Sequence, residues 1–128
     1  MIPLSVPHLA GNENKYVSEC IKTGWISSAG NFVNAFEKQI SEYTNTNHAV
    51  ACMNGTVGLQ TALNLIGVTK DDLILTTNLT FVATLNSISY TGAESVLFDV
   101  KRNTWQIDLT LVEKWIIENT HIRESDGK

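Results

Sequence analysis

The chain has 128 residues, of which 43% are hydrophobic and 17% charged, and its formal net charge is −4. This length suits one modest domain, and this composition suits a packed core rather than a disordered chain. An acidic chain is not expected to bind nucleic acid or a membrane surface, because both need a basic face. The first residues lack the features of a signal peptide, and no apolar run is long enough to span a bilayer.

The cysteines and histidines give no sign of a metal site or a disulfide. Cys20 falls in a predicted helix and Cys52 in a predicted buried strand, which favours a cytoplasmic protein with free thiols. His8, His48 and His121 are scattered along the chain without the spacing of metal ligands. Structural roles are therefore expected for all three histidines.

The amino-terminal part of the chain is predicted to contain two helices. Residues 1–11 are expected to be extended, because Pro3 and Pro7 restrict the backbone. A helix with one apolar face follows and ends near Gly24, and residues 24–30 form a loop. The apolar positions of the first helix are Tyr16, Val17, Cys20 and Ile21, and those of the second are Phe32, Phe36, Ile40 and Tyr43.

Strands and helices alternate through the rest of the chain. The predicted elements are strand 49–53, helix 56–66, strand 73–77, helix 80–90, strand 95–100 and helix 109–118, the last with Asp108 as its N-cap. This alternation implies βαβ units in an α/β fold with a mostly parallel sheet. Because the strands are continuous apolar runs, we expect them to be buried on both faces.

Residues 48–66, HAVACMNGTVGLQTALNLI, predict a strand, a tight turn and a helix. The first amides of such a helix have no partner within the helix and, with the helix dipole, favour an anion. Thr56 adds a hydroxyl donor, and Gly55 allows a ligand to come close to the backbone. An ordinary capped helix would show the same turn. Residues 78–81 follow the next predicted strand, so both turns are expected at one crevice beyond the carboxyl ends of the strands.

Several segments in order resemble one family. They are PLSVPHLAGNE, GWISSAG, FEKQISEYT, NGTVGLQTAL, LTFVATLNSI and FDV with TWQID. Together they resemble the DegT-type sugar aminotransferases, which are fold-type-I enzymes that depend on pyridoxal 5'-phosphate. PHLAGNE and GWISSAG look most like members that make 4-amino sugars for nonulosonic acids. The resemblance implies that residues 1–128 form the amino-terminal portion of the large, cofactor-binding domain, without an internal boundary and with helices on both faces of the sheet.

The resemblance also implies a cofactor site. In the family, the residues that match Gly55, Thr56 and Val57 hold the cofactor phosphate through backbone amides and the threonine hydroxyl. Val57 stands where alanine is common, and a backbone contact survives that change. Phe81 matches an aromatic residue that stacks on the cofactor ring, which suits an electron-poor ring because an aromatic face carries negative charge density. A phenylalanine at this point would otherwise be a core residue. Thr80 is expected to be a helix cap.

A substrate site is implied for the loop at residues 24–30. In the family this loop lines the nucleotide-sugar site near the dimer interface. The residues expected to take part are Trp25, Ile26, Ser27 and Ser28, together with Asn54. The alternative is an ordinary surface loop with one buried tryptophan.

The implied reaction moves an amino group, with glutamate as the expected donor, to a keto group of a nucleotide-linked 6-deoxy sugar. The keto group is expected at C4, the pathway is surface-glycan or nonulosonic-acid biosynthesis, and the intact enzyme is expected to be a homodimer. The family's Schiff-base lysine lies in a later motif, serine-phenylalanine-histidine followed by lysine, and the aspartate facing the pyridine nitrogen also comes later. Neither occurs here. We therefore expect a fragment or a truncated reading frame that is inactive alone.

Two other readings stay open at this point. The chain could be a truncated, non-catalytic α/β module that binds a phosphate or a nucleotide, which the missing lysine favours. It could also belong to a sugar dehydratase of the same fold, because some relatives replace the lysine by histidine.

Overall fold

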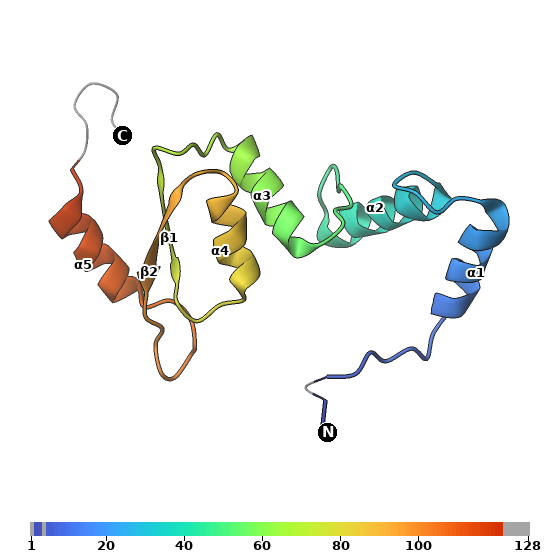
Figure 1. The fold of residues 1–128 in the computed structure, drawn as a ribbon, viewed down its shortest axis with the longest axis horizontal. Helices are drawn as coiled ribbons and strands as arrows, with labels where there is room; N and C mark the ends of the chain where they lie inside the picture. Colours follow the sequence, from blue (N-terminus) through green and yellow to red (C-terminus); the bar gives the residue numbers. More distant parts are fainter. Residues whose placement is uncertain (1, 4, 122–128) are drawn as a thin grey trace. The chain divides into compact units, whose positions relative to one another are not determined.

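The computed structural model describes residues 2, 3 and 5–121 of the chain. The chain divides into two units, Met1–Ala51 and Cys52–Lys128, which are called unit 1 and unit 2 below (Figure 1). Each unit is described by itself.

Unit 1 contains helices α1 (Glu13–Thr23) and α2 (Asn31–Thr44), as the sequence predicts. Helix α1 ends because Gly24 adopts a left-handed backbone with φ of 75°, and its N–H donates to the carbonyl oxygen of Ile21 at 3.4 Å. Helix α2 ends in the same way at Asn45, whose φ is 53°. Asparagine tolerates this conformation better than most residues with a side chain.

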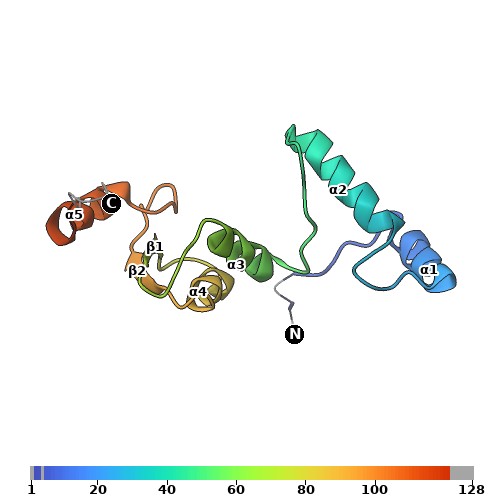
Figure 2. The same cartoon turned by 90° about the horizontal axis from the view of Figure 1, so that it is seen from above.

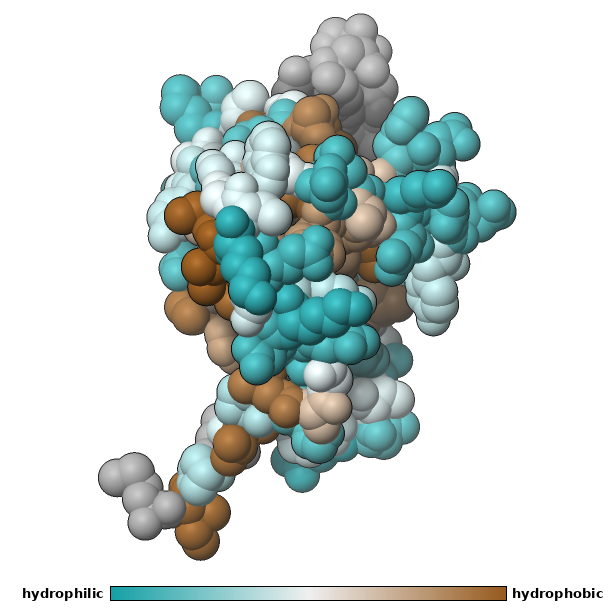
Figure 3. Space-filling view, turned by 90° about the vertical axis from the view of Figure 1, so that its right-hand side faces the viewer, coloured by the Kyte–Doolittle hydropathy of each residue, from teal (hydrophilic) through white to brown (hydrophobic). Residues whose placement is uncertain are grey.

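The helices of unit 1 touch through aromatic residues but bury little. The rings of Tyr16 and Phe32 lie 5.1 Å apart, tilted by 52°. Neither helix contains a buried residue, and on the predicted apolar stripe of α2 Phe36 remains 56% and Tyr43 89% exposed. Figure 3 shows apolar side chains at the surface among polar ones on the face at the α1 side of Figure 1. The apolar stripes therefore exist as predicted, but the described residues do not cover them.

Unit 2 has the predicted α/β architecture. Its elements are α3 (Gly55–Leu65), β1 (Leu73–Thr77), α4 (Val82–Ser89), β2 (Glu94–Phe98) and α5 (Leu109–Asn119). The strands pair in parallel, from Leu73 opposite Glu94 to Thr77 opposite Phe98. In two perpendicular views the strands lie between α4 and α5, with α3 beside α4 (Figure 1 and Figure 2). The prediction of a parallel sheet with helices on both faces is confirmed.

The core of unit 2 is small and lies between β2 and its helices. Among the described residues of unit 2, the buried apolar ones are Ile88, Ala93 and Phe98. The ring of Phe98 meets that of Trp115 edge to face at 6.0 Å. The strands are only partly buried, against the prediction of burial on both faces, because the described sheet has two strands and each keeps an open edge.

The predicted strand at residues 49–53 is wrong: residues 49–52 have no regular secondary structure. A strand needs a partner strand, whereas the N–H of Ala51 donates to the side-chain Oε1 of Glu37 at 2.8 Å. Val50 is 81% and Met53 87% exposed. Cys52 is also exposed, which corrects its predicted place in a buried strand.

The start of α4 and the end of β2 also differ from the prediction. Helix α4 begins at Val82, and the Thr80 hydroxyl bonds to the Thr84 hydroxyl at 3.1 Å, so Thr80 is not the helix cap. Strand β2 stops at Phe98 because the chain turns back soon afterwards, where Val100 forms an antiparallel bridge with Ile107.

The start of α5 agrees with the prediction. The side-chain Oδ1 of Asp108 accepts a hydrogen bond from the N–H of Thr110 at 3.0 Å, so Asp108 is the N-cap.

Candidate functional site

The predicted turn at the start of α3 is present, although a coil and not a strand precedes it. Asn54 is the N-cap, with an extended backbone (φ −162°, ψ 171°). Its side-chain Oδ1 accepts a hydrogen bond from the N–H of Val57 at 3.0 Å, and its carbonyl oxygen accepts one from the N–H of Gly58 at 3.1 Å. This cap fixes the direction in which the helix starts.

The first turn of α3 suits an approaching anion. The N–H groups of Gly55 and Thr56 belong to the first turn, where amides have no acceptor within the helix. A side chain at Gly55 would meet no atom within 4 Å, so the space in front of this residue is open. The Val57 N–H already donates to Asn54. Two of the three predicted phosphate-binding amides are therefore available, together with the Thr56 hydroxyl.

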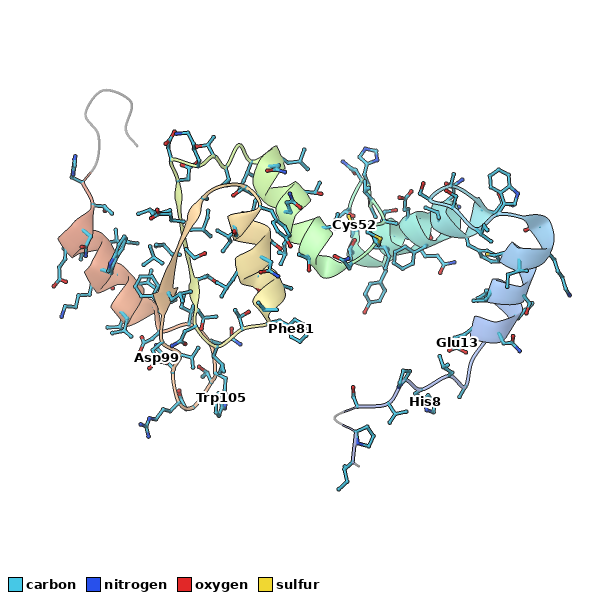
Figure 4. All side chains as sticks on the ribbon, in the orientation of Figure 1. His8, Glu13, Cys52, Phe81, Asp99 and Trp105 are labelled. Atoms are coloured by element: carbon cyan, nitrogen blue, oxygen red, sulfur yellow. The ribbon has the colours of Figure 1, made fainter. Side chains whose placement is uncertain are left out.

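Phe81 lies at the start of α4, directly beyond the carboxyl end of β1, and is 82% exposed. Figure 4 shows its side chain pointing away from the end of the helix. This exposure excludes the alternative that Phe81 is a core residue of the described structure. An exposed aromatic face at this edge of a parallel sheet can stack on a planar ligand.

Ser87, in the second half of α4, links this helix to the start of α3, and the sequence analysis missed it. Its side chain is completely buried, and its hydroxyl lies 2.9 Å from the carbonyl oxygen of Thr56 and 2.7 Å from that of Ala83. Both α3 and α4 run opposite to the strands, so both begin toward the carboxyl end of the sheet (Figure 1). The only sequence signal was a small polar residue within an apolar helix.

The predicted substrate loop lies in unit 1. Trp25 is 59% and Ile26 77% exposed, and Ser27 and Ser28 are exposed as well. The alternative of a loop with a buried tryptophan is therefore wrong. With α1 and α2, the loop lines a groove of about 680 Å³, and Trp25, Ile26 and Ser27 are among its lining residues. Asn54 belongs to unit 2, and its place in the same substrate site stays a prediction.

The described residues contain no group of three histidine, cysteine, aspartate or glutamate side chains that could hold a metal ion. Among the same residues, no helix combines the length and the apolar character needed to cross a membrane.

Residues 7–122 match the DegT/DnrJ/EryC1/StrS aminotransferase family. The chain belongs to this family. It is 41% identical over 119 residues to a GDP-perosamine synthase of Caulobacter vibrioides, and the alignment covers 93% of this chain and 32% of that relative. A GDP-perosamine synthase of Escherichia coli O157:H7 is 38% identical over 119 residues, which covers 93% of this chain and 33% of that relative.

The structure leads to the same family. A protein described as a sugar aminotransferase, Spr1654 of Streptococcus pneumoniae, superimposes in its PLP form with a TM-score of 0.80 and 28% identity, covering 88% of this chain and 29% of that one. The fold predicted from the sequence, part of a fold-type-I aminotransferase, is thus confirmed. The chain spans about a third of the length of the curated relatives.

Proposed function

We propose that this chain forms the amino-terminal portion of a pyridoxal phosphate-dependent aminotransferase that acts on a nucleotide-linked keto sugar. The start of α3 carries the proposal, because Gly55 and Thr56 present amides and a hydroxyl in the family's matching segment. Relatives named GDP-perosamine synthase and a neighbour in a PLP form support the substrate class and the cofactor.

The residues present fit the cofactor in two ways. Open space in front of Gly55 gives a phosphate access to the backbone at the positive end of the helix. The exposed ring of Phe81 offers a face for the pyridine ring, and the bond from Ser87 to the carbonyl oxygen of Thr56 ties α4 to the start of α3. Val57 would join the phosphate site through its amide if Asn54 released it.

Pyridoxal phosphate, when bound, supplies an electron sink for moving an amino group. In the proposed site, Gly55 and Thr56 anchor the phosphate, and Phe81 covers one face of the ring, which restricts its tilt and excludes water from that face. Trp25, Ile26, Ser27 and Ser28 of the loop, together with Asn54, would orient the sugar and its diphosphate. The lysine that carries the proton would come from the rest of the protein.

The finer parts of the proposal concern the substrate and the setting. We infer glutamate as the amino donor, C4 of a 6-deoxy sugar as the acceptor carbon, and a pathway to a surface glycan or a nonulosonic acid. A cytoplasmic homodimer is the proposed state of the intact enzyme. The acceptor carbon and the pathway rest on the resemblance of the segments GWISSAG and PHLAGNE to enzymes that make 4-amino sugars, and the amino donor and the homodimer rest on the resemblance to the family. An assay with UDP-, GDP- and dTDP-linked 4-keto sugars would identify the nucleotide.

The test of the cofactor site is Thr56→Val in the protein expressed from its complete reading frame. Loss of one hydroxyl that bonds to a charged phosphate should weaken the affinity for pyridoxal phosphate by about tenfold. Absorbance titration of the cofactor measures this, and Thr56→Ser, which keeps the hydroxyl, should retain the affinity. If Thr56→Val binds the cofactor as tightly as the parent while its circular dichroism is unchanged, the phosphate site lies elsewhere.

A further inference from the structure

The chain turns back sharply just beyond β2, in a hairpin at residues 100–107. Val100 and Ile107 form an antiparallel bridge, and the N–H of Lys101 donates to the carbonyl oxygen of Gln106 at 2.9 Å. The N–H of Trp105 donates to the carbonyl oxygen of Lys101, also at 2.9 Å. These bonds fix the backbone at the tip of the hairpin, and with it the direction in which each side chain leaves the chain.

Trp105 lies at this tip and has an unfavourable backbone conformation. Its φ is 59°, in the left-handed region that glycine and asparagine adopt more easily. Its side chain is 68% exposed, so packing within unit 2 does not compensate for the backbone conformation. Residues with a strained backbone conformation cluster at functional sites, so such a residue near a ligand-binding edge suggests a function. A large aromatic surface held out in water is suited to contact with a flat, apolar partner.

The hairpin lies at the ligand-binding edge of the sheet. Figure 4 shows Phe81, Asp99 and Trp105 at one end of unit 2, which is the end where the parallel strands finish. A nucleotide-linked sugar is a long molecule, with the base and the sugar on opposite sides of a diphosphate. A base site is therefore expected along the same edge as the ring site at Phe81, but separate from it.

The charges on the hairpin fit a diphosphate next to the base. Lys101 and Arg102 are exposed cations within the turn. The nearby carboxylates are engaged: Asp99 Oδ1 accepts from the N–H of Val100 at 2.8 Å, and Asp108 Oδ1 accepts from the α5 amide and lies 3.9 Å from Lys101 Nζ. The Arg102 guanidinium can pair with phosphate in two-point geometry.

From this arrangement we propose that Trp105 is the base platform of the nucleotide site, with Arg102 placed to contact the diphosphate. This inference rests on the proposed function, because it needs a nucleotide-linked substrate. The ring selects for a planar base and tolerates purine or pyrimidine, because stacking uses the face that all bases share. Trp105 is thus a positioning residue and takes no part in the chemistry.

The experiment compares Trp105→Ala with Trp105→Phe in the protein expressed from its complete reading frame. Calorimetric titration with GDP, UDP and dTDP measures base and diphosphate binding without the sugar. Trp105→Ala should weaken the affinity for the preferred diphosphate by about tenfold, and Trp105→Phe should stay within about threefold of the parent. Tyr90→Ala is the matched control, because Tyr90 is 61% exposed at the other end of α4, and it should bind like the parent.

Three outcomes decide the matter. Weaker nucleotide binding by Trp105→Ala, with unchanged affinity for pyridoxal phosphate and a higher KM at a similar kcat, supports the base platform. Unchanged nucleotide affinity overturns it, and a change in sedimentation alone would make Trp105 a contact between protein chains instead. If the parent protein binds none of the nucleotides, the proposed function itself is contradicted. If the parent and Trp105→Ala bind a nucleotide equally well, only the role of Trp105 is contradicted.

Discussion

Unit 1 consists of two helices and a loop, whereas unit 2 holds parallel strands between helices. Both contain many apolar side chains, but no residue of α1 or α2 is buried, while unit 2 buries Ser87, Ile88, Ala93 and Phe98. Two helices in contact leave most of each apolar stripe outside the contact. A strand–helix–strand unit, in contrast, encloses residues between layers. The comparison shows that a βαβ unit can make a core by itself, even when that core is small.

The largest expected effect concerns the 128-residue polypeptide expressed alone. Its exposed apolar surface and open strand edges favour self-association, so we expect an oligomeric or molten species without a cooperative transition. We also expect no transaminase activity, because none of its lysines stands in the family's motif. Sedimentation velocity, urea unfolding and an amino-transfer assay check this. A monodisperse monomer with one sharp transition would show that the chain folds as one stable domain. It would contradict the conclusion that unit 1 lacks a stable core.

The second prediction tests where the stability lies. Phe98→Ala removes a buried ring and its contact with Trp115, and should cost unit 2 about 3 kcal/mol. Phe36→Ala in α2, where the ring is 56% exposed, should cost less than about 0.5 kcal/mol. Amide hydrogen exchange in the protein expressed from its complete reading frame reports both. The amides of β1, β2 and α4 should exchange faster in the Phe98 variant only. Equal losses in the two variants would mean that unit 1 has a core of its own.

The smallest expected effect concerns the bond between α4 and the start of α3. Ser87→Ala removes a buried hydroxyl bond to the carbonyl oxygen of Thr56, and should cost about 1 kcal/mol. Ser89→Ala on the same helix is the control, because Ser89 is exposed. The amides of Val57 and Gly58, which donate to Asn54, should exchange faster in the Ser87 variant only. A similar exchange rate in both variants would show that α3 is held in place by other contacts.

The sequence predicted best what depends on local pattern. The strand at residues 73–77 and the cap at Asp108 were found because an apolar run between polar residues, or a carboxylate before a helix, is enough to indicate them. The strand at 49–53 failed because apolarity does not reveal whether a partner strand is present, and Ala51 bonds to Glu37 instead.

The candidate site also has some features that depend on local sequence and others that depend on tertiary contacts. The turn before α3 was visible in the sequence because it is local. The bond from Ser87 to Thr56 is tertiary, and the left-handed backbone of Trp105 follows from a hairpin whose closing bonds no pattern marked. The sequence therefore predicts interactions between residues that are close in sequence, and it misses interactions between residues that are distant in sequence.

The cap on α3 has a consequence for the affinity of any anion that binds there. The Oδ1 atom of Asn54 holds the N–H of Val57 at 3.0 Å and so acts as a built-in substitute for a ligand oxygen. An incoming phosphate that recruits this amide must displace that substitute, so binding becomes an exchange of acceptors, and its net gain is reduced by about the worth of one hydrogen bond, roughly 1 kcal/mol. Asn54 thereby sets a threshold: a weakly bound anion leaves the cap in place, and only a ligand held by further contacts can open it.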